Sequence, residues 1–408
     1  MSAIASQPVM AAPPLDPRTP PIELLRLIGP PEERSSPEPI AAPTVEQSIA
    51  YCRALATSHY ENFSVLSALV PERLRDDFAA VYAFCRWADD LGDETGSTPE
   101  ARARSERLLA WWRAELDSCF RGMGLPAHVR GMGLPAHVSG ASPEVSFPEP
   151  SNQDQDPRPP RSRHGLVSPY HEPTHPVYIA LRATAAKHPH LTAKPFQDLI
   201  DAFIQDQHFG TIEQPYRTWE QVLDYCARSA NPVGRIVLTL GGYAPPEVVG
   251  GDPANADRYA MSDATCTALQ LINFWQDVRR DLLERDRVYI PEFGPGGQPT
   301  GITRGLLRDW INRPNDPRAR VPFIRAIRPL LEETAHLFNR GRPLAGTLNG
   351  GVGPVVGLFG AGGDAILRAV QRLGCATLWD RPRLAASEKA WLVGRAWLAA
   401  KFGSGSGG

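Results

Sequence analysis

The sequence predicts an all-α protein. Apolar side chains recur at steps of three and four residues through most of the chain from residue 45 to residue 402, which is the period of helices that bury one face. Alternating runs bounded by hairpin turns, which would indicate strands, are absent from the sequence. Once the segments unfit for a core are set aside, about 300 residues are left, enough for one well-buried domain. We therefore expect a single helical domain over residues 45–402.

Three segments are predicted to lie outside this domain. Residues 1–44 are Pro-rich without a sustained period, residues 121–175 hold Pro, Gly and Ser with few large apolar side chains, and residues 403–408 read GSGSGG. We expect a disordered tail, a disordered insertion and a flexible end. The insertion contains the unit RGMGLPAHV twice, at 121–129 and 130–138. Two copies are too few for a solenoid, so duplication within a tolerant loop is favoured over a docking segment.

The first helical block is expected before the insertion. It contains AYCRALATSHYENF, LRDDFAAVYAFCRWADDLGD and ARARSERLLAWWRAELDSCF, each with helical spacing of its apolar residues. Pro71 separates the first two segments, and GSTPE before the third is a capping signal.

The second block is expected after the insertion. Helical spacing returns in PFQDLIDAFIQDQHF, in the stretch from 218 to 243 and in ADRYAMSDATCTALQLINFWQDVRRDLLERD. The NPVGR stretch at 231–235 indicates a break between helices, with a role in the pocket as an open alternative. Past a Gly/Pro-rich loop at 291–301, further helices are predicted near 302–312, 321–342, 363–374 and 386–402.

Charge and cysteine content exclude several classes of protein. The net charge of −2 gives no positive field for nucleic acid. The six cysteines have no CxxC or Cys/His ligand spacing, which indicates free thiols of a reducing compartment and no zinc site. Neither eighteen uninterrupted apolar residues nor a secretory signal is present. We expect a cytoplasmic protein.

Two predicted helices carry pairs of aspartates four residues apart. On the first helix, Asp89 and Asp93 share a stripe of about 60° with Tyr82 and Arg86, while Asp90 lies off it. On the second, a stripe of about 80° contains four polar side chains, those of Gln270, Asn273, Asp277 and Asp281. Buried amides need polar partners, so Gln270 and Asn273 are predicted to line a polar cavity.

Paired aspartates one turn apart suit a hard divalent cation that bridges to phosphate. One such pair is usually a solvated helix face, and RRDLLERDR at 279–287 taken alone indicates a solvated, salt-bridged helix. Asp90 and Glu94 are likewise predicted to be solvated. Two matching stripes nevertheless favour a Mg²⁺ site that holds a diphosphate and makes it a leaving group, with Tyr82 and Arg86 contacting phosphate oxygens.

The segments YAFCRWADDLGDE and QLINFWQDVRRDLLERDRVYIP resemble the two aspartate motifs of the squalene and phytoene synthases. This resemblance covers about 46–118 and 176–402 and implies an isoprenoid-synthase-type helical bundle with a central cavity. It implies Mg²⁺ contacts, and thereby catalytic roles, for Asp89, Asp93, Asp277 and Asp281. It further implies that the substrate contacts a set of polar residues, namely His59, Asn62, Tyr82, Arg86, Gln270, Asn273 and Gln276.

Within this family, HYENFSVLSALVP, SANPVGR and NFWQD most resemble the hydroxysqualene synthases of the bacterial hopanoid pathway. That resemblance implies conversion of presqualene diphosphate and water to hydroxysqualene and diphosphate. Glu61 and Gln276 stand where relatives have Lys and Arg, so fewer positive charges and a single substrate diphosphate are expected. No strand-coupled GxGxxG is present, and GVGPVVG at 351–357 is too weak a match, so NADPH is not expected.

The implied reaction passes through a carbocation, which needs an apolar pocket so that water does not capture it early. Aromatic residues at helical spacing usually belong to the core. Candidate walls of the pocket are nevertheless Phe78, Phe84, Phe203, Phe209, Phe274 and Trp275. Two other functions stay open: head-to-head condensation of two prenyl diphosphates to presqualene diphosphate or phytoene, and a non-catalytic helical assembly protein. Because the expected substrate is membrane-soluble, peripheral contact with the inner face of the membrane is an open expectation. Contact with neighbouring hopanoid-pathway enzymes is another.

Overall fold

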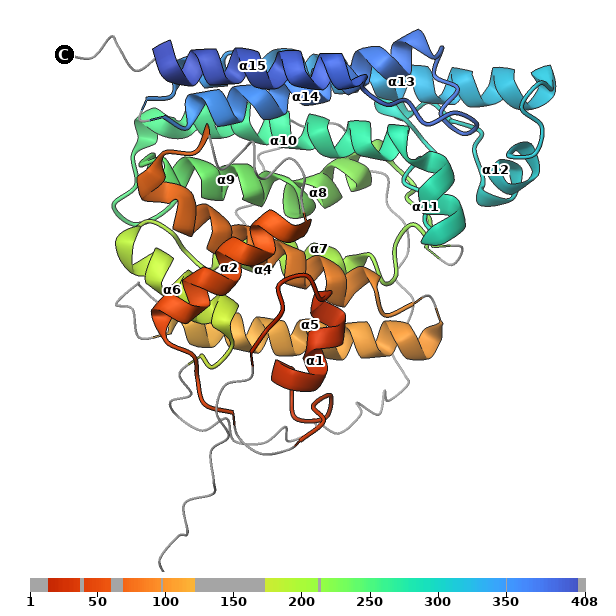
Figure 1. Cartoon of the computed structure of the whole chain (residues 1–408). Helices are drawn as coiled ribbons and strands as arrows, with labels where there is room; N and C mark the ends of the chain where they lie inside the picture. Colours follow the sequence, from red (N-terminus) through yellow and green to blue (C-terminus); the bar gives the residue numbers. More distant parts are fainter. Residues whose placement is uncertain are drawn as a thin grey trace, which may run out of the picture. The chain divides into compact units, whose positions relative to one another are not determined.

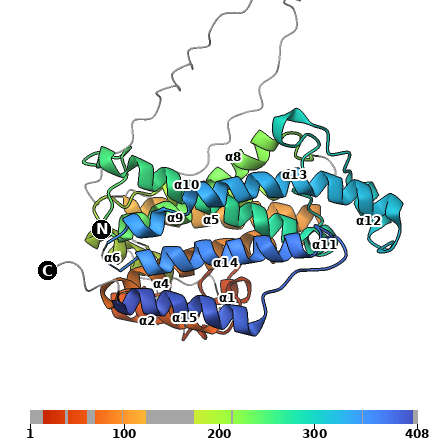
Figure 2. The ribbon, with the colours of Figure 1, turned by 90° about the horizontal axis from the view of Figure 1, so that it is seen from above.

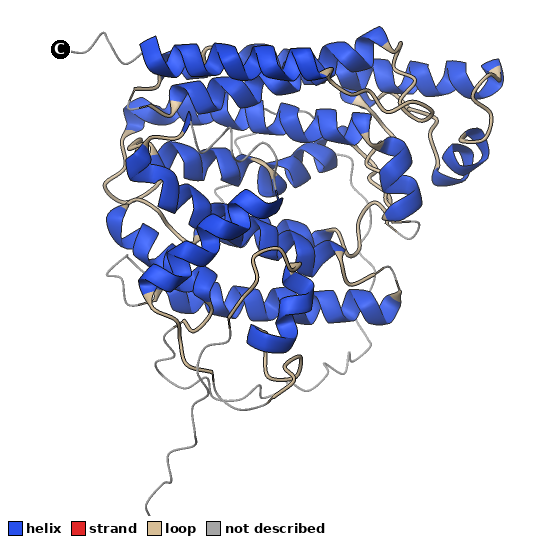
Figure 3. Ribbon diagram, in the orientation of Figure 1, coloured by secondary structure: helices blue, strands red, loops and turns tan. Residues whose placement is uncertain are grey.

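The computed structural model describes residues 14–36, 40–59, 69–96, 98–121, 173–211, 214–349 and 351–402. These ranges fall in one compact unit. Within them the chain forms helices and loops but no β-strand, as Figure 3 shows. The all-α prediction is therefore confirmed. Residues 122–172 of the predicted insertion and the predicted end at 403–408 lie outside the described residues.

The first half of the chain packs around α4, the helix that carries Asp89 and Asp93 (Figure 1). The helices of this half are α1 Pro21–Ile28, α2 Val45–His59, α4 Arg75–Asp93, α5 Pro99–Phe120, α6 Pro176–Lys187 and α7 Lys194–Gln205, with the 3₁₀ turn η1 Glu72–Leu74 leading into α4. Each of the other five α-helices contacts α4. The first aspartate pair is thus held by a helix with neighbours on several sides.

The second half packs around α10, which leads into the second aspartate pair. Its helices are α8 Trp219–Ser229, α9 Asn231–Leu240, α10 Ala256–Gln276, α11 Val278–Glu284, α12 Arg304–Trp310, α13 Pro317–Gly341, α14 Gly353–Arg372 and α15 Ala386–Phe402, with 3₁₀ turns η2 Pro253–Asn255, η3 Pro295–Gly297 and η4 Leu344–Thr347. Helices α8, α9, α13 and α14 all contact α10 (Figure 2). The NPVGR stretch begins α9 directly after α8 ends, as predicted.

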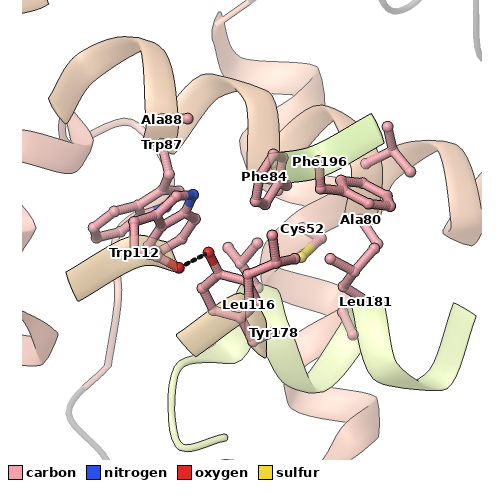
Figure 4. Packing of buried hydrophobic residues seen from close by; sticks show 14 of the residues in the cluster. Cys52, Ala80, Phe84, Trp87, Ala88, Trp112, Leu116, Tyr178, Leu181 and Phe196 are labelled. Atoms are coloured by element: carbon pink, nitrogen blue, oxygen red, sulfur yellow. Dashed lines mark hydrogen bonds between the residues drawn. The ribbon is translucent and has the colours of Figure 1, made fainter. Parts of the chain in front are cut away.

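Large aromatic side chains fix one face of α4 in the core (Figure 4). Phe84 and Trp87 are fully buried, and Trp87 stacks on Trp112 of α5 with ring centroids 5.5 Å apart. Tyr178 of α6 donates its hydroxyl hydrogen bond to the Trp112 carbonyl at 2.5 Å. Burying each such side chain contributes about 2–3 kcal/mol. The aspartates of α4 are thereby held on another face of the same helix.

The prediction of a disordered tail up to residue 44 is wrong for part of it. Residues 21–28 form α1, in which Leu24 and Leu25 are only 2% and 1% exposed and belong to the core around α4. The high proline content was misleading because Pro21 occupies the first turn, where proline favours a helix. Glu33 then accepts two hydrogen bonds from Arg104 of α5, at 2.9 and 2.7 Å.

The predicted insertion also ends earlier than residue 175. His175 is buried and caps α6, because its Nδ1 accepts a hydrogen bond from the Val177 amide at 3.3 Å. Its ring meets Trp87 edge-on, with centroids 4.4 Å apart, and Trp112 at 4.9 Å. His175 is therefore part of the core that supports α4.

Burial of His175 should make the stability of the fold depend on pH. Burial lowers the pKa of His175 to about 3, whereas an unfolded histidine titrates near 6.5. Below pH 6.5 the unfolded chain binds a proton that the folded chain excludes, so stability falls by about 1.4 kcal/mol per pH unit until pH 3. Between pH 7 and pH 5 we expect the protein to lose about 2 kcal/mol more than the His175→Asn variant, measured by urea unfolding. An equal loss in both proteins would contradict this role.

All six cysteines lie in the described ranges and are free, as predicted. Among the described helices, none combines the length and the apolar character needed to cross a bilayer.

Candidate active site

A cavity of about 410 Å³ lies where α4, α7, α8, α10 and α11 meet. Asp89 and Asp93 line it from α4, and Asp277 and Asp281 line it from the end of α10 and from α11. Two sequence segments nearly two hundred residues apart thus supply carboxylates to one space. Their meeting point is the candidate active site.

In the first aspartate pair, Asp89 is partly exposed, whereas Asp93 is covered and bound by arginines. The Asp89 side chain is 43% exposed, and its nearest charged partner is Arg86 at 3.7 Å. Asp93 is almost covered and binds two arginines that follow the second pair in sequence. Arg285 Nη1 lies 3.0 Å from its Oδ2, and Arg287 Nη1 lies 2.9 Å from its Oδ1.

The first residue of the second aspartate pair forms a kink between two helices. The prediction of one continuous helix through both residues is wrong, because α10 ends at Gln276 and Asp277 has the non-helical angles φ −107° and ψ 15°. The Asp281 amide still donates to the Asp277 carbonyl at 2.9 Å, so one turn separates the two. Both residues line the cavity, Asp277 at the kink itself and Asp281 from α11.

Arginines neutralise the second pair too. Arg280 Nη2 lies 3.0 Å from Asp277 Oδ2 and 3.3 Å from Asp281 Oδ1. Arg381, in the loop between α14 and α15, binds Asp277 through two of its guanidinium nitrogens. The guanidinium groups of Arg280, Arg285 and Arg381 all line the cavity.

A buried polar network lies beside Asp93. The chain turns at Asp286, which has a φ of 56°, and this turn lets Arg287 reach both Asp93 and Asp206 of the segment after α7. Arg287 Nη1 lies 3.8 Å from Asp206 Oδ2. Asp206 also accepts hydrogen bonds from the hydroxyl groups of Tyr225 at 2.5 Å and Tyr289 at 3.3 Å. Sequence patterns had not pointed to Asp206, Tyr225 or Tyr289.

The cavity favours the binding of positive charge. Burial raises the pKa of Asp206 to about 6, although Arg287 opposes this shift. Burial likewise raises the pKa of Asp281 to about 6, against the effect of Arg280. Five aspartates and three arginines line the space, and Arg287 pairs with two of these aspartates, which leaves an excess of one negative charge if all are ionised. A cation would offset this excess.

The aspartate carboxylates of the cavity are donor groups of the kind that Mg²⁺ binds. In the described ranges, no three His, Cys, Asp or Glu side chains converge closely enough to hold a metal by themselves. Mg²⁺ commonly keeps several waters and takes only one or two carboxylates, with phosphate oxygens completing its coordination. Asp89 with Asp93, and Asp277 with Asp281, could each hold an ion in this way.

The other predicted site residues divide into three groups. Gln270, Asn273 and Gln276 line the cavity, and Gln276 donates a hydrogen bond to the Pro382 carbonyl at 2.7 Å. Tyr82 and Arg86 do not line it; Tyr82 packs against the first core. His59 is the last residue of α2, but its side chain, Glu61 and Asn62 lie outside the described residues.

Asp90 corrects one prediction. It is 1% exposed rather than solvated, because α1 packs against α4 and Arg86 Nη2 approaches its Oδ1 to 2.5 Å. Burial raises the pKa of Asp90 to about 7 despite this arginine. Arg86 is thus turned toward an acid of its own helix, while Glu94 is exposed as predicted.

The prediction of a solvated RRDLLERDR segment is wrong for two of its arginines. Arg280 and Arg285 belong to the RRDLLERDR segment that was interpreted as solvated, yet both face the cavity. Their spacing of three and four residues from Asp277 and Asp281 was the available signal. Arg381 gave no such signal, since it lies about a hundred residues further along the chain.

Aromatic side chains close part of the cavity. Phe203, Phe274, Tyr225 and Tyr289 line it, and the Phe274 and Tyr289 rings stack with centroids 3.9 Å apart. Phe84 and Trp275, which were also candidate walls, are fully buried core residues instead. The cavity therefore combines a charged side with a partly apolar wall.

The chain is similar in sequence to two groups of known enzymes. A hydroxysqualene synthase from Sinorhizobium fredii is 39% identical over 94 residues, which are 23% of this chain and only 27% of that protein. A phytoene synthase from Thermus thermophilus is 28% identical over 348 residues, or 85% of this chain and 91% of that protein.

Similarity extends to solved structures and to a family model. The squalene synthase HpnC from Alicyclobacillus acidocaldarius superposes with a TM-score of 0.56 and 32% identity, covering 81% of this chain and 95% of that one. The family model described as squalene/phytoene synthase matches residues 56–388, a span that contains both aspartate pairs and every arginine of the cavity. The chain belongs to the squalene/phytoene synthase family.

Proposed function

We propose that the protein is a Mg²⁺-dependent hydroxysqualene synthase, which converts presqualene diphosphate and water to hydroxysqualene and diphosphate. The observation that carries the proposal is the cavity in which two aspartate pairs meet three arginines. Prenyl diphosphates are the substrates of this family, and such a cavity has the charges needed to hold a diphosphate together with its metal. The S. fredii relative is a hydroxysqualene synthase.

The arginines would bind the diphosphate. Arg280, Arg285 and Arg381 present guanidinium groups to the same cavity, and guanidinium–phosphate hydrogen bonds are charge-assisted and often bidentate. The aspartate pairs would hold the metal, which when bound supplies charge neutralisation of the leaving group. Gln270 and Asn273 line the neighbouring wall and would orient oxygen atoms there.

The aromatic wall would protect the cation that is left when the carbon–oxygen bond to diphosphate breaks. Phe203 and Phe274 line the cavity and would limit the access of water, which would prevent early capture of the cation. Water finally adds to the rearranged carbon and loses a proton, giving the alcohol. No electrons are gained or lost by the substrate, so the proposed reaction needs no NADPH.

The second candidate is head-to-head condensation of two prenyl diphosphates. Its support is the T. thermophilus phytoene synthase, which matches almost over its whole length. The same charged cavity would ionise the first substrate, and the two candidates differ in whether a second diphosphate-bearing chain or water reacts with the cation.

Product analysis tests the proposal. Purified protein is incubated with Mg²⁺ and without NADPH, in separate reactions with presqualene diphosphate, farnesyl diphosphate and geranylgeranyl diphosphate, and the products are identified by mass spectrometry. We expect hydroxysqualene from presqualene diphosphate, and no turnover when the metal is removed with a chelator.

Three results would count against it. Presqualene diphosphate accumulating from farnesyl diphosphate, or phytoene from geranylgeranyl diphosphate, would favour the condensation. Inertness toward all three substrates would favour a non-catalytic member of the family.

A further inference from the structure

Arg381 reaches the cavity from a loop. Arg280 lies on α11 and Arg285 directly follows this helix, whereas Arg381 belongs to the loop of residues 373–385 between α14 and α15. Its side chain is 42% exposed, and its guanidinium binds Asp277 through two nitrogens. An arginine side chain has much rotamer freedom, and a mobile loop would add to the entropy that is lost when a ligand is bound. Strong binding by Arg381 therefore requires that the loop itself be fixed.

The core and a tryptophan fix the loop on the side before Arg381. Residues 376–378 are at most 1% exposed. The indole nitrogen of Trp379 donates a hydrogen bond to the carbonyl of Trp310, the last residue of α12, at 2.9 Å. The Trp379 ring meets Phe323 of α13 edge-on, with centroids 5.3 Å apart. The backbone that leads to Arg381 is thus attached to two helices.

A buried amide fixes the loop on the side after Arg381. Gln276, the last residue of α10, is 9% exposed, and its Nε2 donates a hydrogen bond to the Pro382 carbonyl at 2.7 Å. Pro382 is itself buried. The residue after Gln276 is Asp277, the acid that Arg381 binds. Two neighbouring residues at the end of α10 therefore hold the backbone beside Arg381 and its guanidinium.

Gln276 also lines the cavity itself, but its neutral amide is a weak group for a diphosphate. Hydrogen bonds from a guanidinium to phosphate are charge-assisted and about twice as strong as those from an uncharged donor. The amide is already bonded to the Pro382 carbonyl, and a buried carbonyl that loses its donor is costly. The larger contribution of Gln276 is therefore the placement of Arg381.

We propose that Gln276 and Trp379 are positioning residues, which hold the loop so that the Arg381 guanidinium faces the diphosphate of the substrate. Binding then costs less conformational entropy, because the loop is fixed before the ligand arrives. This inference rests on the proposed function, since it takes the ligand to be a diphosphate. It assigns to Gln276 an effect that passes through Arg381 and not through a contact of its own.

A double-mutant cycle on ligand binding tests this assignment. The full-length protein is titrated with inorganic diphosphate in the presence of Mg²⁺, and the affinity is measured by calorimetry. Gln276→Met keeps the length of the side chain and removes the amide, and it should weaken binding about tenfold. Arg381→Met should weaken it about a hundredfold. In the Arg381→Met background, Gln276→Met should cause no further loss.

A second anchor variant and a matched control accompany the cycle. Trp379→Phe removes the indole hydrogen bond but keeps an aromatic ring, and it should behave like Gln276→Met. Gln197 of α7 also donates one hydrogen bond, to Asp117 at 3.1 Å, but does not line the cavity, so Gln197→Met should bind diphosphate like the unmodified protein. Urea unfolding shows that each variant is folded, and a merely structural role would lower its stability without changing the affinity of the folded protein.

The outcomes separate this inference from the proposed function. Equal weakening by Gln276→Met with and without Arg381 would indicate a direct contact with the ligand and would overturn the positioning role. Unchanged affinity of both Gln276→Met and Trp379→Phe would overturn it as well. If the unmodified protein did not bind diphosphate at all, the proposed function would fail together with this inference.

Discussion

Replacing Asp277 by alanine should lower turnover about a thousandfold and leave the helical fold in place. Asp277 is the point at which Arg280 and Arg381 converge, and it lines the same cavity as the first aspartate pair. Preorganised charge at a reacting group typically contributes a factor of about 10²–10³ for a single contact, and a lost metal site adds to it. Asp89→Ala should have a similar effect, because Asp89 is the most exposed carboxylate of the two pairs.

A control at the start of α10 distinguishes the loss of an acid in the cavity from the loss of an acid on the surface. Asp257 lies in the first turn of α10, is exposed and does not line the cavity. Asp257→Ala should therefore retain full turnover. Steady-state rates with saturating substrate and circular dichroism spectra are compared for the three variants. Normal turnover of Asp89→Ala or Asp277→Ala would refute the assignment of these residues to the metal.

Replacing Arg287 by alanine should lower the free energy of unfolding by about 3–5 kcal/mol. Arg287 is 9% exposed on its side chain and lies between Asp93 and Asp206, which are almost equally covered. Its removal leaves Asp206 without a cation in a buried position where only the hydroxyl groups of Tyr225 and Tyr289 remain as partners. Leaving a buried charge uncompensated is among the costliest single changes in a folded protein.

Urea unfolding measures this effect against a surface arginine. Arg308 is half exposed and pairs with Asp286, the residue next to Arg287, so Arg308→Ala should cost about 1 kcal/mol or less. Adding Asp206→Asn to Arg287→Ala should recover part of the lost stability, since it removes the unpaired charge. If Arg287→Ala were no more destabilising than Arg308→Ala, the network would not support the fold.

Features that depend on residues close together in the sequence could be predicted. Asp89 and Asp93, and Asp277 and Asp281, are four residues apart, and one turn of helix is enough to bring each pair together. The apolar positions of α4 likewise repeat at helical spacing and are buried. These features depend on neighbours within a few residues, so the pattern of the chain predicts them without knowledge of the fold.

Ion pairs between residues far apart in the sequence could not be predicted. Arg285 and Arg287 follow the second aspartate pair, but they bind Asp93 across more than 190 residues. No periodicity reports such a pairing. The prediction that Asp90 is solvated is wrong for the same reason. The helix that covers Asp90 is α1, which lies in the Pro-rich stretch predicted to be a disordered tail.

The arginines bound to the aspartates have a consequence for ligand binding. A cation that takes Asp93 or Asp277 must separate it from an arginine, and a guanidinium without its partner in a partly buried cavity is unfavourable. A diphosphate offers that guanidinium a new partner. Each ligand thus removes the obstacle to the other, which is positive thermodynamic coupling between metal and diphosphate. The internal ion pairs would then keep the site closed to either ligand alone and open it to both together.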